Sequence, residues 1–456
     1  MLTEGCAASD SSVLRSVHHT DEMSTLFILC VLAQQPPASP LQFRVGDTTI
    51  QVGAIVDGMT VGRSTATGNG IATSFGTIPF GNTPQGNLSE LQMSAQNSRL
   101  SVLASGALGS MTVKGFIETD FLGNAPNALQ VTANSNTPRM RLAWAQVLTG
   151  EFEFVAGQAW SMLTPNRRGL SPLTGDVFVS QNIDLNLQMG LTWTRAMQFR
   201  FIAHPSDTLT AGVALENPEQ YVGTAVVLPA SFPTFEVDNG SVTNQTPNRF
   251  PDVIGKVAFD PKTGKTRQHV EAAVVLRGFK TYNPATQTTF STMGNGVEAA
   301  GNFEIVPNVR ILASGFWSDG GGRYIANVNG PDFIVNPDAS PTLVGSRSTL
   351  AGGEYTYQRT VAYGYFSYAS FDQNVTTDAD GKPIGYGIAG STAANHTLHE
   401  TTLGVTQTLF RDPKIGALQV LAQYSNVART PFSVPSGAPS HATTNMIFID
   451  VRYILP

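Results

Sequence analysis

The sequence is poor in charged residues. Only 13% of its 456 residues are Asp, Glu, Lys or Arg, about half of the ~25% usual in soluble globular domains. The balance is slightly acidic, with 27 Lys and Arg against 33 Asp and Glu. Basic clusters of the kind that contact phosphates are missing, so no nucleic-acid partner is expected.

Cysteine is almost absent, and long hydrophobic runs are absent altogether. The two cysteines, Cys6 and Cys30, lie in the first thirty residues, which argues against a disulfide framework or a thiolate metal site. No run of ~18 apolar residues occurs, which excludes ordinary transmembrane helices. Glycine is plentiful, with 44 residues. A chain of this length forms either two or three soluble domains or one large β structure.

The start of the chain resembles a targeting segment. Residues 25–33, TLFILCVLA, form a short apolar core that ends in Ala33, a residue acceptable to signal peptidase. Lysines and arginines are nearly absent upstream, which favours Met23 as the true start. We predict a targeting segment over 1–33 and a short linker over 34–47. The alternative is that the apolar core is a buried strand.

One pattern repeats from residue 48 to the end. Segments of about ten residues alternate apolar and polar side chains, and Gly, Pro, Asn and Asp separate them, which is typical of strands. The pattern predicts sixteen strands. They are expected near 48–57, 90–103, 110–122, 138–148, 151–159, 191–203, 208–216, 252–260, 266–279, 292–305, 308–319, 349–357, 360–371, 398–410, 414–427 and 444–455.

The connections alternate strictly between short turns and long loops. Such alternation makes every strand reverse direction and gathers the long loops at one end. A transmembrane up-and-down barrel has this layout, whereas a soluble sandwich with Greek-key crossings does not sort its loops so cleanly. The long loops are expected at 58–89, 123–137, 160–190, 217–251, 280–291, 320–348, 372–397 and 428–443.

Each predicted strand has one apolar face and one polar face. In the last strand, Ile447, Ile449 and Val451 alternate with Asp450 and Arg452, and successive side chains of a strand point to opposite sides. Sixteen strands enclose a wide channel, and hydrocarbon forces the sheet to close on itself. We therefore predict an all-β antiparallel barrel, with its apolar faces in lipid and its polar faces in a watery lumen. The last strand should pair with the strand before it and with the first strand.

Alternation also predicts which charged side chains face the lumen. On the strand RMRLAWAQ, Arg139 and Arg141 are expected to face it, whereas Met140, Leu142 and Trp144 are expected to face lipid. Opposed charges would create a field across the channel, but pairing between neighbouring strands is the alternative for each residue. The predicted set is Lys114, Glu118, Asp120, Arg139, Arg141, Arg200, Arg267, Glu271, Arg277, Arg310, Asp450 and Arg452.

Four stretches resemble the DcaP-like trimeric outer-membrane porins. They are NSRLSVLASG (97–106), GFIETDF (115–121), RMRLAWAQV (139–147) and FVAGQAWS (154–161). The family's N-terminal heptads are missing, and the chain ends in Leu-Pro rather than Phe. The resemblance implies a homotrimer in lipid and lipopolysaccharide that passes small, often acidic, solutes.

The third long loop, near 160–190, carries the only adjacent basic pair, Arg167 and Arg168. Porins commonly fold this loop into the lumen, and we expect the pair at a pore constriction that binds solute. Fixed charge in a narrow pore with low-dielectric walls attracts anions more strongly than on an open surface. The alternative is a solvated loop tip or a subunit contact.

No catalytic residue, metal site or cofactor is predicted. The stretch HTLHE (396–400) lacks the HExxH spacing of a zinc protease, and no G-x-S-x-G elbow occurs. His269 and Glu271 could form an acid–base pair, but a salt bridge on the lumen wall is the simpler interpretation. The leading hypothesis is an outer-membrane porin for small hydrophilic solutes, with dicarboxylates among them. The alternatives are a non-conducting structural or adhesin barrel and an outer-membrane hydrolase.

Overall fold

The computed structural model describes residues 41–123, 137–240, 246–264 and 266–456. The predicted targeting segment at 1–33 and Met23 lie outside the described residues. Within the predicted linker, β1 (Gln42–Val45) forms a short antiparallel hairpin with the start of the first wall strand.

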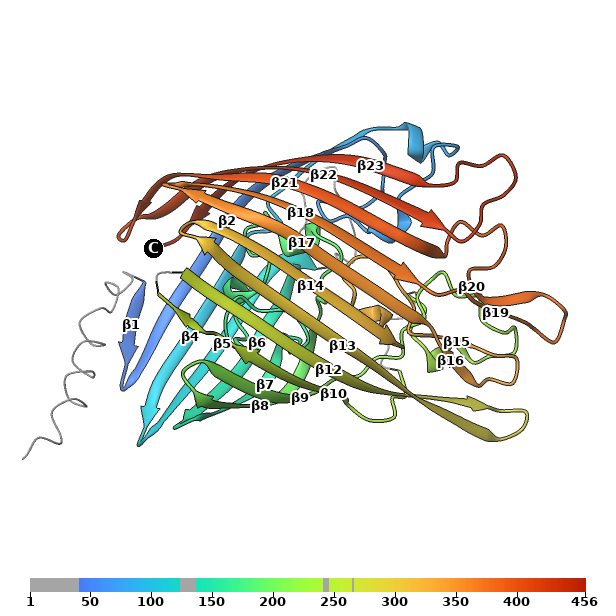
Figure 1. The fold of residues 1–456 in the computed structure, drawn as a ribbon, viewed down its shortest axis with the longest axis horizontal. Coiled ribbons are helices and arrows are strands. Elements are labelled where there is room, and N and C mark those ends of the chain that lie inside the picture. Colours follow the sequence, from blue (N-terminus) through green and yellow to red (C-terminus); the bar gives the residue numbers. More distant parts are fainter. Residues whose placement is uncertain (1–40, 124–136, 241–245, 265) are drawn as a thin grey trace, which may run out of the picture.

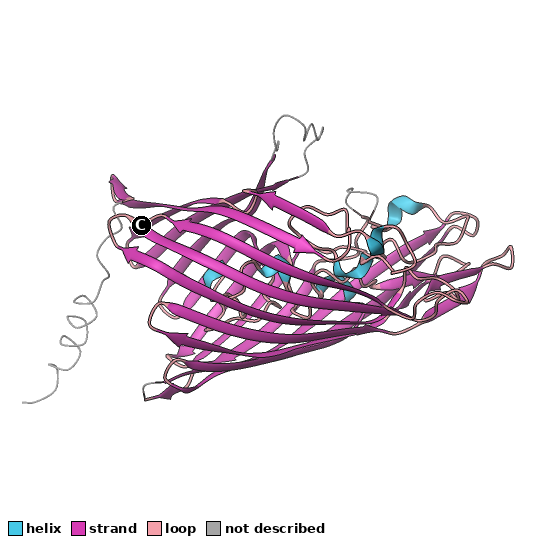
Figure 2. Ribbon diagram, turned by 90° about the horizontal axis from the view of Figure 1, so that it is seen from above, coloured by secondary structure: helices cyan, strands magenta, loops and turns pink. Residues whose placement is uncertain are grey.

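The wall is a closed ring of sixteen antiparallel strands (Figures 1 and 2), as predicted. The second of them is broken into two pieces, β3 and β4. In order around the ring the strands are β2 (Thr48–Arg63), β3 (Glu90–Ser94) with β4 (Arg99–Leu108), β5 (Met111–Gly123), β6 (Thr137–Thr149), β7 (Phe152–Trp160), β8 (Arg195–Ser206), β9 (Leu209–Glu216), β10 (Asp252–Phe259), β12 (Thr266–Asn283), β13 (Thr288–Val306), β14 (Val309–Asp319), β17 (Gly345–Tyr357), β18 (Thr360–Phe371), β21 (Asn395–Asp412), β22 (Gly416–Pro431) and β23 (Ala442–Ile454).

The ring closes between the last strand and the first. In β23, Ile447 lies opposite Tyr424 of β22 on one side and opposite Gly62 of β2 on the other. Both predicted partners of the last strand are therefore confirmed. Closure pairs the first wall strand with the last, and hydrocarbon requires a closed sheet because it offers no hydrogen bonds to a free strand edge.

The two faces of the wall differ in exposure and polarity. In β23, Ile447, Ile449 and Val451 are about half exposed on the outer face, whereas Asp450 is fully buried on the inner face. An outer face rich in aliphatic side chains dissolves in lipid but not in water. Among the described residues, no helix is long and apolar enough to cross a bilayer.

One part of the predicted face assignment is wrong. Glu118 of β5 pairs with Leu142 and Thr119 pairs with Met140, so Arg141 is an extra, unopposed residue. Such a β-bulge shifts the alternation by one place. Leu142 and Trp144 are consequently buried on the inner face and do not face lipid; Met140 is exposed.

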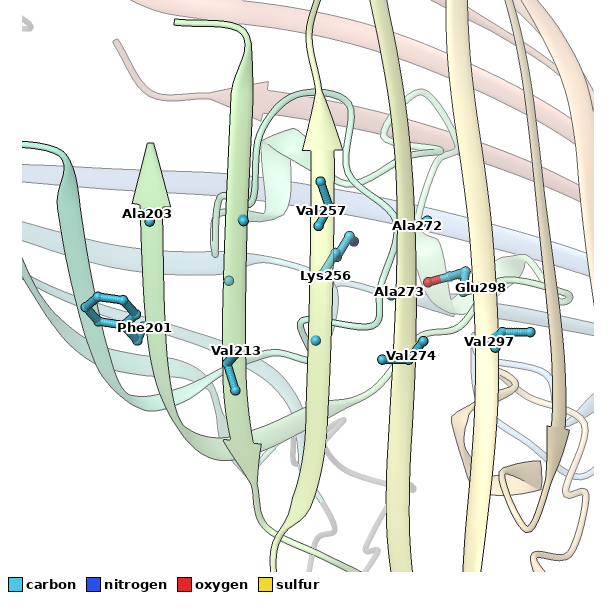
Figure 3. Close-up of a pocket in the computed structure, with 13 residues that line it drawn as sticks. Phe201, Ala203, Val213, Lys256, Val257, Ala272, Ala273, Val274, Val297 and Glu298 are labelled. Carbon is cyan, nitrogen blue, oxygen red and sulfur yellow. The ribbon is translucent and has the colours of Figure 1, made fainter. Parts of the chain in front are cut away.

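The outer face of β8, β9, β10, β12 and β13 carries an apolar groove of about 680 Å³ (Figure 3). Exposed Phe201, Val213, Val257 and Val274 line it beside small residues such as Gly255. The groove lies in the band that contacts lipid.

The two ends of the barrel differ in their connections (Figure 1). One end has tight turns, of which Gly109 and Gly150 are typical because their φ angles of +60° and +56° suit residues without a Cβ. The other end has the long loops. Two small hairpins lie there, β15 (Phe333–Val335) with β16 (Pro341–Leu343), and β19 (Asn374–Thr377) with β20 (Pro383–Tyr386). A further short strand, β11 (Lys262–Thr263), extends the turn before β12.

Candidate pore constriction

The loop between β7 and β8, residues 161–194, is held against one side of the inner wall by carboxylates. The backbone N–H of Met162 donates to Glu216 at 2.7 Å, that of Asn166 donates to Glu271 at 3.2 Å, and that of Gly169 donates to Asp260 at 3.0 Å. Buried backbone donors need such partners. These carboxylates belong to β9, β12 and the turn after β10.

The same loop also contacts the far side of the ring. The N–H of Met189 donates to Glu400 of β21 at 2.8 Å, and a guanidinium nitrogen of Arg452 donates to the carbonyl of Ile183 at 2.9 Å. Asp184 forms an ion pair with Arg99 of β4. Contacts on opposite walls mean that the loop crosses the inside of the barrel.

Apolar packing adds to these polar anchors. Phe178, Leu185 and Leu191 of the loop are buried in one cluster with Leu142 and Trp144 of β6. The bulge at Arg141 therefore has a structural purpose, because it turns two large apolar side chains toward the loop. Where the loop leaves and rejoins the wall, the rings of Trp160 and Trp193 stack with their centroids 3.6 Å apart.

A buried chain of charges supports the loop on the β10–β12 wall. The ammonium of Lys256 lies 2.8 Å from Glu271 and donates to the carbonyl of Thr164 at 2.8 Å. His269 lies 2.9 Å from Glu271 through one ring nitrogen and 2.9 Å from Asp260 through the other. His269, Glu271 and Lys256 are thus joined in one buried network of hydrogen bonds and ion pairs, in which Glu271 contacts both basic side chains.

The adjacent basic pair splits into two different environments. Arg167 is largely buried and forms an ion pair with Glu354 of β17. Arg168 is exposed, and no hydrogen bond or ion pair to it occurs within the described part of the chain. Of the two arginines, only Arg168 is therefore free to meet a mobile ion.

Arg168 lines two cavities at the tight-turn end of the barrel. One has a volume of about 700 Å³ and is also lined by Arg267, Arg310 and Asp260. The other has a volume of about 270 Å³ and contains Lys114. We call these the turn-side cavities. Arg267 is exposed and Arg310 half-buried, so cationic groups border both spaces.

The four predicted charges near the long-loop ends of β5 and β6 lie on the other side of the crossing loop and pair with one another. They are Glu118, Asp120, Arg139 and Arg141. Asp120 accepts hydrogen bonds at 2.7 Å from both Arg139 and Arg141, and Arg141 also binds Glu118 at 2.7 Å. Arg195, at the start of β8, lies beside this cluster with its guanidinium 5.4 Å from the ring centroid of Trp160.

Asp184 of the crossing loop lies beside this cluster and forms an ion pair with Arg99. Burial acts to raise the pKa of Asp184, but the positive charges of Arg99 and Arg141 and the N–H of Asn186 outweigh it and hold the pKa below its ordinary value. Asp184 is therefore an ionised anchor at neutral pH.

The other predicted charges are structural anchors. Arg200 donates to the carbonyls of Leu170 at 3.0 Å and Trp160 at 2.7 Å, and so fixes both ends of one loop segment. Arg277 lies 3.0 Å from Asp252 and 2.7 Å from Asp332. Arg452 pairs with Asp57 at 2.7 Å and with Asp450 at 2.8 Å.

Several inner-face charges escaped the sequence prediction. Strand alternation would have been enough to predict four of them, because each lies on the inner face of a predicted strand. They are Asp57, Lys256, Glu354 and Glu400. Arg195 lay inside a predicted strand, but the true strand begins at this residue. Within the described residues, no group of three or more His, Cys, Asp or Glu could hold a metal ion.

No protein-family model and no curated relative matches the chain. Solved structures do. The outer-membrane channel DcaP of Acinetobacter baumannii superposes with a TM-score of 0.65 at 16% identity, over 91% of this chain and 99% of that one. OprB of Pseudomonas putida gives 0.51 at 10% identity over 89% and 94% of the two chains. An anion-selective porin from Comamonas acidovorans gives 0.50 at 11% identity over 90% and 100%.

At these identities the similarity establishes the fold. The predicted resemblance to DcaP is confirmed at that level. A closed barrel of sixteen antiparallel strands with an apolar outer band is the architecture of bacterial outer-membrane proteins. The chain therefore has the fold of an outer-membrane porin.

Proposed function

We propose that the protein is a passive channel for small hydrophilic solutes that favours anions, and that Arg168 is the residue passing anions contact most directly. The observation that carries this proposal is the contrast between Arg167 and Arg168. Arg167 is neutralised by Glu354, whereas Arg168 stands exposed between the two turn-side cavities. An unpaired cation in a confined space lowers the energy of an anion there.

The surrounding charges support the same sign of preference. One turn-side cavity is bordered by Lys114, Arg168 and the carboxylate of Glu153. The other is bordered by Arg267 and Arg310 beside the arginine pair, and by Asp176 and Asp260, so cations outnumber carboxylates in both linings. Two unit charges 4 Å apart attract by ~1 kcal/mol in bulk water and ~4 kcal/mol at an effective dielectric constant of 20. Several cations around one space favour solutes with two carboxylates, and dicarboxylates are therefore our proposed substrates.

The assembly is part of the proposal. The sequence resemblance to DcaP-like porins supports a homotrimer in lipid and lipopolysaccharide. Chemical cross-linking and light scattering of the detergent-purified protein would show three copies if this is right and one copy if it is not.

Planar-bilayer recordings test the channel and its selectivity. We expect discrete conductance steps and a reversal potential under a KCl gradient that shows preference for chloride. Arg168→Ala should lower the chloride preference about 2- to 5-fold, because the loss of ~0.5–1 kcal/mol of attraction changes a partition ratio by that factor. Arg359→Ala is the matched control, since Arg359 lies in a tight turn and lines neither turn-side cavity.

The outcomes separate the alternatives. If correctly folded protein gives no conductance steps in the bilayer, a structural or adhesin barrel is favoured. The crossing loop is consistent with that alternative, because it is anchored inside the barrel. Conductance with equal selectivity in wild type, Arg168→Ala and Arg359→Ala would remove Arg168 from the solute path.

A further inference from the structure

A third cavity lies at the long-loop end and shares no residue with the turn-side cavities. Its volume is about 260 Å³, and it is lined by Glu219 and Tyr221, by residues between 322 and 330, and by Trp193 at the end of the crossing loop. Pockets for drug-sized ligands run from ~300 to ~1,000 Å³, so this one fits a single small group. We call it the loop-end cavity. Its side chains include Trp193, Glu219, Tyr221, Arg323, Asn327 and Asn329.

Hydrogen bonds fix the walls of the loop-end cavity. Asp332 accepts from the N–H groups of Arg323 at 3.0 Å and Tyr221 at 3.3 Å, and its own N–H donates to the carbonyl of Tyr221 at 2.8 Å. The N–H of Trp193 donates to the carbonyl of Tyr324 at 2.9 Å. Three loops are thus tied together, and the cavity is preformed.

The amide NH₂ groups of the cavity already donate to groups in other loops. The NH₂ group of Asn327 donates to the carbonyl of Asn186 at 2.9 Å, and that of Asn329 donates to the hydroxyl of Ser74 at 3.0 Å. Glu219 accepts from the hydroxyl of Thr246 at 3.1 Å. The remaining carbonyl and carboxylate oxygens are acceptors, so the site suits a ligand that brings donors.

Tyr221 adds a hydroxyl group to the lining. Burial and the charges of Asp238 and Asp332 raise the pKa of Tyr221 to about 12, so its hydroxyl keeps its proton at neutral pH and can donate to a ligand oxygen. The Nε of Arg323 also lacks a hydrogen-bond partner among the described residues, but it is buried from solvent and does not contact the space inside the cavity.

The charge balance argues against a free anion in this cavity. Arg277 pairs with Asp252 and Asp332, and Arg323 pairs with Asp252, so much of the positive charge is already neutralised. Glu219 adds a further carboxylate to the lining. Hydroxyl groups satisfy such a mixed lining, because each both donates and accepts. The rings of Trp193 and Tyr221 supply an apolar surface for C–H groups.

We propose that the loop-end cavity binds the hydroxylated part of a solute as it enters, so that the channel takes small hydroxylated carboxylates, of the sugar-acid class. The inference rests on the proposed function, since the turn-side cavities would receive the carboxylate. Two sites of different chemistry on opposite sides of the crossing loop select a solute that carries both kinds of group.

Binding to detergent-purified trimer or monomer tests the loop-end cavity without any need for conductance. Glucose and gluconate are titrated while the fluorescence of Trp193 and the other tryptophans is followed. Both compounds should bind. The double variant Glu219→Gln with Tyr221→Ala should weaken binding about 5-fold or more, because each of the two substitutions removes an interaction worth ~1 kcal/mol. Asn336→Ala is the matched control, because Asn336 bonds within its own loop to Ser340 and does not line the cavity.

Bilayer recordings place the same site in the transport path. Gluconate added on the long-loop side should reduce the chloride current at lower concentration than propionate does, and Glu219→Gln with Tyr221→Ala should remove that difference. Loss of selectivity with Arg168→Ala tests the other proposal separately. Glucose and gluconate binding that is absent in wild type, or equal in wild type and the cavity variant, would overturn the inference.

Discussion

The two sides of the crossing loop use arginine in opposite ways. On the β5–β6 side, Arg139 and Arg141 are paired with Asp120 and Glu118. On the turn side, Arg168 has no partner among the described residues and faces open space. Buried pairs hold the loop in position, whereas unpaired exposed charges set the field that a solute meets. A count of arginines facing the lumen therefore overstates how many can act on a solute.

The largest expected effect concerns Glu271, which anchors the crossing loop to the β10–β12 wall. Its carboxylate neutralises Lys256 and His269 and binds the N–H of Asn166. Glu271→Gln should lower the free energy of unfolding by about 3–5 kcal/mol, because it leaves a buried ammonium without its counter-charge. Urea titration of protein folded into lipid vesicles measures this loss.

A second substitution separates charge from shape at the same position. Adding Lys256→Gln to Glu271→Gln removes both charges and should recover part of the lost stability. Asp380→Asn, in an exposed loop, is the control and should have the stability of wild type. Equal stability of Glu271→Gln and wild type would show that the charge chain is not an anchor.

Arg167 and Arg168 give a smaller and sharper test, since they are neighbours in sequence. Arg167→Ala leaves the carboxylate of Glu354 with only the hydroxyl of Tyr365, 2.8 Å away, as a donor, and should cost about 1–3 kcal/mol of stability. Arg168→Ala should change stability by less than about 0.5 kcal/mol. Thermal unfolding followed by the heat-induced shift on gels compares them, and equal losses would contradict the division of roles.

The fold could be predicted from the sequence because a barrel wall is nearly periodic. The predicted strand at 252–260 differs from β10 (Asp252–Phe259) by one residue. The exceptions lie where the period breaks. The segment 90–103 is interrupted into β3 and β4, and the bulge at Arg141 reverses Trp144. Both features depend on how neighbouring strands pair, and the alternation of side chains within one strand does not predict that pairing.

The site was less accessible to sequence analysis than the fold. The segment that carries Arg167 and Arg168 could be recognised as unusual, but the partner of Arg167 is Glu354, 187 positions away. The loop-end cavity likewise combines three loops, two of them joined through Asp332 and the third through the backbone bond from Trp193 to Tyr324. Long-range contacts of irregular segments decide which charges are free, and no local pattern records them.

Asp184 provides the smallest test, through pH. Its folded-state pKa lies below the unfolded value because Arg99 and Arg141 outweigh the effect of burial. A depressed pKa contributes stability that is present above the unfolded value of ~3.9 and is lost as pH falls through the folded value. The gap in unfolding free energy between wild type and Asp184→Asn should therefore be constant from pH 5 to 7 and shrink below about pH 4. Urea titrations across this range measure the gap, with Asp380→Asn as the exposed control. A gap that persists unchanged into the acid range would mean that Asp184 holds the crossing loop by shape and neutral hydrogen bonds, and the charged anchoring of the β5–β6 side would then lose its clearest support.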